Sequence, residues 1–174
     1  MRAVISIVVV LILSGTGCSL AVGPSTPRPN VMVAPDKAPV ALVLSPAVQD
    51  DFVIPSTGSV RDVPVKSWRT TLTSGFQSAF PATGGSGRRL ELLEASLSFA
   101  PAAVSMNGTA AVVAQIRFKA RLFDATGTEV GSLAGTAQAR EANTSATEGG
   151  MTTNAAKAVE AMYEGLAVEL FSKT

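Results

Sequence analysis

The chain lacks histidine and holds a single cysteine among its 174 residues. Without histidine it lacks the side chain that most often transfers protons near neutral pH and the commonest ligand of zinc, which excludes Ser-His-Asp, Cys-His and the usual zinc sites. One cysteine cannot form a disulfide within the chain, so the fold must be stable without one. Because aromatic residues make up only 5% of the chain, the core must be mainly aliphatic.

An excess of charge and long apolar runs are missing as well. The 14 basic and 13 acidic side chains give a formal net charge of +1, which leaves no electrostatic basis for binding nucleic acid. The main apolar stretch, residues 3–13, is shorter than the roughly 20 residues of a membrane-spanning helix. We therefore expect neither a nucleic-acid partner nor a permanent transmembrane anchor.

The N-terminus has the pattern of a secretory signal peptide. Arg2 precedes the apolar stretch, and small residues occupy positions 14–17 before Cys18. These small residues resemble the lipobox of bacterial lipoproteins, in which a diacylglycerol is attached to the cysteine before the signal is removed. The resemblance implies that residues 1–17 are a signal peptide and that Cys18 carries the lipid.

The residues around Cys18 bear on the final location of the protein. Gly15 stands where the lipobox prefers leucine, and Ser19 stands where aspartate would favour retention in the inner membrane. The resemblance to Gram-negative lipoproteins thus implies an outer-membrane anchor facing the periplasm, and several acyl chains suffice for stable binding. The alternative is an ordinary signal cleaved after Ala21, which would give a soluble periplasmic or secreted protein.

Prolines recur every few residues between Cys18 and Pro39. This density blocks helix and favours an extended, polyproline-like chain. We expect residues 18–39 to form a lipidated N-terminus and tether. The remainder, residues 40–174, has the size of a single domain.

Two short features follow the tether. The apolar run VALVL at residues 40–44, bounded by Pro39 and Pro46, predicts a strand that is buried on both faces and central in a sheet. The adjacent carboxylates Asp50 and Asp51 have no third ligand nearby. They are expected to lie in a solvated loop rather than to bind a cation.

Residues 65–80 have apolar side chains at spacings of three and four, which predicts an amphipathic helix ended by Pro81. Trp68 lies on the apolar stripe and is expected to be a core anchor. The glycine-rich stretch at residues 82–87 lacks the lysine and hydroxyl residue of a phosphate-binding loop, so a nucleotide site is rejected.

A second helix is predicted from about residue 153 to 171, again from apolar spacing. Thr153 or Asn154 is expected to cap its start. Tyr163 adjoins the apolar stripe, so we expect its ring to pack and its hydroxyl to reach solvent.

Strict alternation predicts strands at residues 90–99 and 111–123. The turn at residues 124–127 contains a glycine that tolerates positive φ, so a strand at residues 129–142 should pair antiparallel as a hairpin. The side chains expected to point inward are Leu93, Ala95, Leu97 and Phe99 in the first strand and Val112, Ala114, Ile116, Phe118, Ala120 and Leu122 in the second.

The predicted order is strand, helix, three strands, helix. This order predicts an α+β fold in which two helices cover one face of a mostly antiparallel sheet of about four strands.

A row of cations is the main candidate binding feature. Arg117, Lys119 and Arg121 share one strand face and span roughly 13 Å. They could contact lipid headgroups, lipopolysaccharide phosphates or an acidic partner. The alternative is a solvated face balanced across the sheet by glutamates, namely Glu91, Glu94 and Glu129.

No group of carboxylates is placed for catalysis. The glutamates fall on strand faces or on the polar side of the last helix, so we expect no enzymatic activity, metal site or cofactor. Those of the last helix are Glu160, Glu164 and Glu169.

The whole pattern resembles a group of known proteins. A lipidated N-terminus, a Pro-rich tether, the helix VKSWRTTLTSGFQSAF, the hairpin IRFKARLFDATGTEVGSLAG and the final helix AAKAVEAMYEGLAVELF together resemble small Gram-negative envelope lipoproteins. The most similar groups are the YajG-type lipoproteins and the auxiliary lipoproteins of ABC-type transporters, and the lipopolysaccharide-assembly lipoproteins share the element order.

This resemblance implies a non-catalytic accessory binding subunit of an envelope transport or assembly system, with an envelope protein as partner. A structural or regulatory tether acting on cell-wall synthesis is the alternative.

Overall fold

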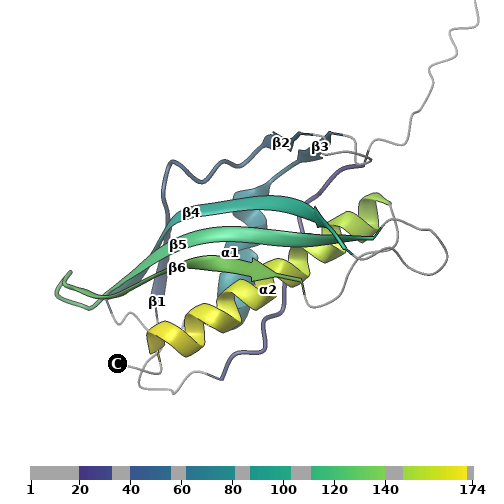
Figure 1. Ribbon diagram of the computed structural model, residues 1–174. Coiled ribbons are helices and arrows are strands. Elements are labelled where there is room, and N and C mark those ends of the chain that lie inside the picture. Colours follow the sequence, from purple (N-terminus) through teal and green to yellow (C-terminus); the bar gives the residue numbers. More distant parts are fainter. Residues whose placement is uncertain are drawn as a thin grey trace, which may run out of the picture.

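The computed structural model describes residues 20–32, 40–55, 62–80, 87–102, 111–139 and 147–171. The predicted signal peptide and Cys18 lie outside these ranges. The described residues form a four-stranded sheet, a small two-stranded sheet and two helices. Both helices cover one face of the larger sheet, so the predicted α+β class is confirmed (Figure 1).

The elements are β1 (Val40–Leu44), β2 (Phe52–Ile54), β3 (Val63–Val65), α1 (Trp68–Ala79), β4 (Arg88–Pro101), β5 (Val112–Phe123), β6 (Glu129–Gln138) and α2 (Glu148–Phe171). The larger sheet has the strand order β1-β4-β5-β6. The β4, β5 and β6 strands are antiparallel neighbours, whereas β1 runs parallel to β4. The smaller sheet, β2 with β3, is antiparallel and was not predicted.

The central strand β5 follows its predicted alternation, and all six of its predicted inward side chains are buried. In β4 the register shifts between Leu92 and Glu94, which is the effect of one extra residue in a β-bulge. The bulge leaves Leu93 half-buried and turns Leu90 and Leu92 into the core instead.

The turn between β5 and β6 is the predicted hairpin. Gly127 adopts a φ of 85°, which a residue without Cβ allows at little cost. Asp124 accepts hydrogen bonds from the hydroxyl of Thr126 and the N–H of Thr128, and these bonds lower the pKa of the Asp124 carboxyl.

The β1 strand lies at the edge of the sheet, so its predicted central position is wrong. It pairs only with the first part of β4, from Arg88 to Leu92. Its side chains alternate between packed and exposed, and Val43 is 39% exposed. Val40, Leu42 and Leu44 pack against the core on one face, whereas Ala41 and Val43 of the same run are exposed.

Asp50 and Asp51 lie in an exposed loop, as expected, but they organise the start of α1. Ser67, before the helix, adopts a left-handed backbone and makes no side-chain cap. The Oδ1 atoms of Asp51 and Asp50 instead accept the N–H groups of Ser67 and Arg69 at 3.0 and 2.9 Å. The hydrogen bond from Lys66 lowers the pKa of Asp51.

The α2 helix begins at Glu148, earlier than predicted, so the expected cap at Thr153 or Asn154 is wrong. The hydroxyl of Thr147 accepts the N–H of Gly150 at 3.1 Å and caps the helix. Asn154 is buried inside the helix, and its Oδ1 accepts the N–H of Ala114.

The ring and hydroxyl of Tyr163 are both buried between α1 and α2, so the expectation of a solvent-facing hydroxyl is wrong. The hydroxyl donates to the carbonyl oxygen of Leu72. Trp68 is a core anchor, as predicted, and its Nε1 donates to the carbonyl oxygen of Ala95 at 2.9 Å.

Candidate functional site

Residues 20–32 belong to the predicted tether, yet they pack along the domain. The N–H of Val22 donates to the carbonyl of Pro64 at 2.8 Å, and the N–H of Lys66 donates to the carbonyl of Val22 at 2.9 Å. Val22 thereby forms a parallel bridge with β3 and is 1% exposed. The segment is extended, as its prolines predict, but it is not a free spacer.

The next residues of the segment are held by hydroxyl groups of the two helices. The N–H of Gly23 donates to the hydroxyl of Thr152 at 3.0 Å, and the N–H of Ser25 donates to that of Thr71 at 3.1 Å. A polyproline-like chain has no internal hydrogen bonds. Side chains of α1 and α2 therefore supply the acceptors.

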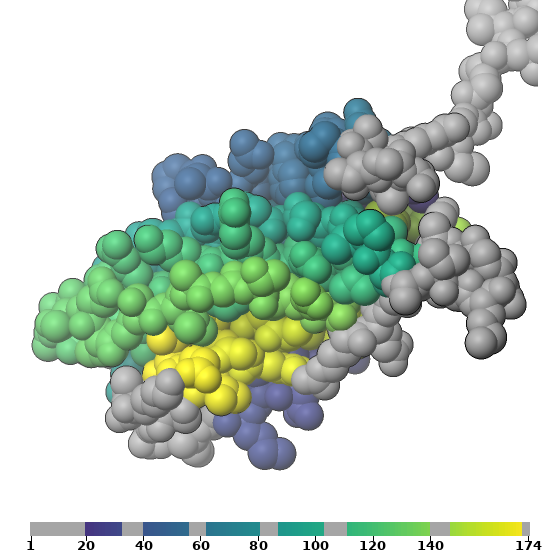
Figure 2. Space-filling model, in the orientation of Figure 1, coloured from purple at the N-terminus to yellow at the C-terminus, as the bar shows by residue number. Residues whose placement is uncertain are grey.

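Two glutamates of α2 fix the rest of the segment. Glu160 and Glu164 accept the N–H groups of Arg28 and Asn30, each at 3.0 Å. Figure 2 shows this segment, in purple, against the yellow α2 helix. These glutamates were expected on a solvated helix face, and sequence periodicity alone gives no indication that they bind another part of the chain.

The predicted cation row lies on the outer face of the sheet and is partly neutralised. Arg117 pairs with Glu94 at 2.8 Å, and Arg121 lies 3.7 Å from Glu129. Lys119 is exposed and makes no salt bridge with another described residue. Exposed pairs of this kind contribute at most about 1 kcal/mol to stability.

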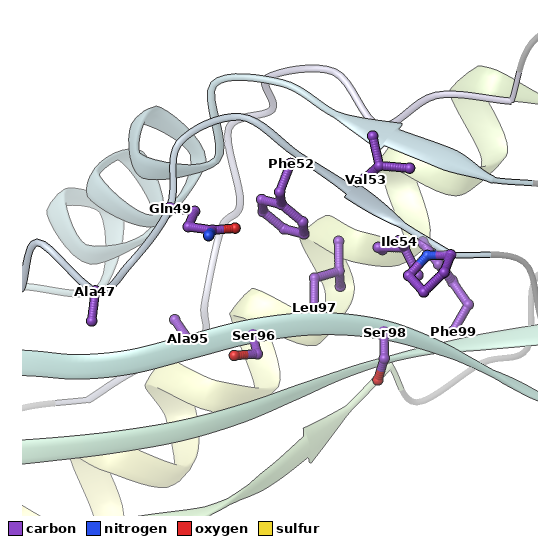
Figure 3. Close-up of a pocket in the computed structure, with 11 residues that line it drawn as sticks. Ala47, Gln49, Phe52, Val53, Ile54, Ala95, Ser96, Leu97, Ser98 and Phe99 are labelled. Carbon is purple, nitrogen blue, oxygen red and sulfur yellow. The ribbon is translucent and has the colours of Figure 1, made fainter.

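A groove of about 470 Å³ lies between β2 and β4 (Figure 3). The sequence did not predict it because each strand of the small sheet has only three residues, too few to show a period. The only indication of these strands in the sequence is two short apolar runs, FVI and VPV, within a stretch that contains several prolines. The groove is lined by Ala47, Gln49, Phe52, Val53, Ile54, Pro55, Ala95, Ser96, Leu97, Ser98 and Phe99.

The groove is uncharged. None of its eleven lining residues carries an ionisable side chain. Its polar side chains are one amide and two serine hydroxyls, and the other eight lining side chains are apolar. Such a surface suits a neutral ligand, because an unpaired charge buried there would lose its hydration without compensation.

Neither a metal cluster nor a membrane span is found in the described part of the chain. Groups of three or more His, Cys, Asp or Glu side chains suited to a metal ion do not occur there. Its helices are also too short or too polar to cross a membrane.

The fold defines a small α+β protein with helices on one sheet face. No family model and no curated protein matches the sequence. The structure is similar to the crystal structure of protein XCC0632 from Xanthomonas campestris, a DUF330 protein, with a TM-score of 0.49 and 15% identity over 90% of this chain and 97% of that one. This likeness assigns neither a family nor a function.

Proposed function

We propose that the protein is a non-catalytic outer-membrane lipoprotein and that its domain is an accessory binding subunit of an envelope transport or assembly system. One observation carries the proposal: the segment directly after Cys18 is built into the domain at Val22. A signal-like N-terminus with a cysteine just before this segment fits a domain that a lipid on Cys18 would hold close to the membrane.

The short link has a geometric consequence. Only Ser19, Leu20 and Ala21 separate Cys18 from Val22, and an extended chain spans at most about 3.6 Å per residue. A lipid on Cys18 would therefore hold Val22 and the adjoining β3 strand within roughly 15 Å of the anchor. The domain would face the membrane with the end that carries β2 and β3, instead of moving freely on a long tether.

The anchor is tested by palmitate labelling of the wild type and of Cys18→Ala, followed by membrane fractionation. We expect the wild type to be labelled and to sediment with the outer membrane, and the variant to lose both properties. A variant that is still labelled and still sediments with the outer membrane contradicts the lipid anchor.

The binding role needs a separate measurement. Extraction in mild detergent should co-purify the wild-type protein with components of one envelope complex. A protein that is always recovered as a lone monomer without a lipid ligand would contradict the role as an accessory subunit.

A further inference from the structure

We infer that the groove between β2 and β4 binds an extended, uncharged polypeptide segment of a partner protein, which adds as a β-strand between the two sheets. The inference rests on the proposed function, since it names the chemistry by which the binding subunit would take its partner.

One wall is the outer edge of β4 beyond the end of β1. The backbone pairing of β4 with β1 and the residue after it ends at Leu92, whose carbonyl accepts the N–H of Ser45. The β4 strand itself continues to Pro101. The carbonyl of Ala95 accepts the Trp68 Nε1 proton, so the backbone of Ala95 faces away from β5.

The far end of β4 has the same orientation. Ala114, the β5 partner of Phe99, uses its backbone groups to bond Asn154 and Ala139 on the side away from β4. In an antiparallel ladder, residue pairs that exchange backbone hydrogen bonds alternate with pairs that do not, and the N–H and C=O groups of the latter point away from the partner strand. Leu97 and Phe99 therefore direct their N–H and C=O groups outward, to the groove.

The opposite wall is the outer edge of β2. The carbonyl of Pro64 accepts the N–H of Val22 and so points away from β2. Val53 is the β2 partner of Pro64, which makes this pair a non-bonded one. The N–H and C=O of Val53 consequently face away from β3, on the side of the groove.

The outward N–H and C=O groups of Leu97, Phe99 and Val53 have no hydrogen-bond partner among the described residues. Leu97 and Phe99 line the groove although they are only 5% and 8% exposed as whole residues, and a ligand that displaces water from the groove must replace the hydrogen bonds of their backbone groups. A polypeptide strand offers donors and acceptors to both walls at once. An acyl chain would fill the apolar space and leave the same groups unpaired.

The size of the groove fits a short strand. With a strand spacing of about 4.8 Å, a rise of about 3.3 Å and a sheet thickness of about 10 Å, one residue occupies roughly 160 Å³. A groove of about 470 Å³ thus holds about three residues. The inserted residues are uncharged because the lining is uncharged.

The test uses Val53, which is 55% exposed and outside the core. Val53→Pro removes the donor on the β2 wall without touching the β2–β3 bonds, and Val53→Thr keeps the N–H with a similar shape. Heptapeptides selected on the wild type from a random displayed library serve as probes. We expect them to lose affinity about fivefold or more with Val53→Pro and to bind Val53→Thr as they bind the wild type.

A second measurement separates strand addition from apolar contact. The selected peptide should slow hydrogen exchange at the amides of Leu97 and Phe99, and its copy methylated at alternate backbone nitrogens should not bind. No selected peptide, equal binding to Val53→Pro, or occupation of the groove by free myristate in place of peptide would each overturn the inference. If an envelope partner co-purifies equally with the wild type, Val53→Pro and Val53→Thr, the inference about the groove is wrong but the proposed function is supported. If no partner co-purifies even with the wild type, the proposed function fails instead.

Discussion

The hydroxyl of Tyr163 donates a 2.9 Å hydrogen bond to the carbonyl oxygen of Leu72 and so links α2 to α1 inside the core. The ring of Tyr163 contacts those of Phe76 and Phe80 edge-on, with centroids 5.9 and 6.3 Å apart. This arrangement combines aromatic packing with one directional bond. It makes the tyrosine a determinant of how the two helices are aligned.

Tyr163→Phe keeps the ring and removes the bond. We expect the free energy of unfolding to fall by about 1 kcal/mol, the usual net value of one buried hydrogen bond. Urea denaturation measures this change. Val168→Ala, on the exposed side of the same helix, is the control and should stay within about 0.5 kcal/mol of the wild type. An unchanged midpoint for Tyr163→Phe would contradict a stabilising role of the bond.

The burial of the same tyrosine leads us to expect that the protein loses stability at alkaline pH. Burial raises the pKa of Tyr163 above its ordinary value of 10.0, so the unfolded state loses this proton at a lower pH than the folded state. Stability is therefore fully present below pH 10 and falls as the pH rises above it. Tyr163 is the only tyrosine, so tyrosinate absorbance reports on it alone. The absorbance should rise together with unfolding, and a rise near pH 10 in folded protein would disprove the burial.

The close packing of α1 against α2 at Gly75 leaves no room for a larger side chain. A Cβ at this position would lie 2.8 Å from Cγ1 of Val159 and 3.2 Å from the ring of Tyr163. Gly75→Ala should destabilise the protein by about 1–3 kcal/mol, because overpacking outweighs the gain in helix propensity. Gly165→Ala, which meets nothing within 4 Å, should stabilise it by up to about 1 kcal/mol. Thermal denaturation that moves both variants in the same direction would contradict the close contact.

The contacts of residues 20–32 with α2 are tested by the double variant Glu160→Ala, Glu164→Ala. Loss of both acceptors should speed amide exchange at Arg28 and Asn30 several-fold. The amide of Val22 is the internal control, since its bond to the carbonyl of Pro64 is untouched. Equal exchange at Arg28 and Asn30 in the variant and the wild type would mean that the glutamates do not hold the segment.

Elements with a long, regular period could be predicted from the sequence. The inward side chains of β5 and the existence of both helices follow from alternation and from three-to-four spacing, because each element buries one face. Periodicity does not report which strand lies beside another, so β1 was placed centrally although it is an edge strand. It also does not report a bulge, which reversed the expected orientation near Leu93.

The candidate site could not be predicted for a different reason. The groove depends on backbone groups at two strand edges, and sequence patterns describe side chains. The docking of residues 20–32 depends on acceptors such as Glu160 and Glu164, whose positions relative to the prolines are set only by the folded domain. Alternation places Arg117, Lys119 and Arg121 on one strand face and leaves three glutamates as possible partners. The strand register decides among them, since Arg117 pairs with Glu94 and Arg121 lies near Glu129.

The packing of residues 20–32 also constrains the order in which the molecule is completed. The bond from Gly23 reaches a residue 129 positions later in the chain, and that from Asn30 reaches one 134 positions later. A chain is synthesised from its N-terminus, so this segment emerges first, and its partners in α2 emerge last. The contacts of Gly23, Arg28 and Asn30 must await the folding of α2, and until then this part of the chain remains open to any enzyme that modifies or cleaves it.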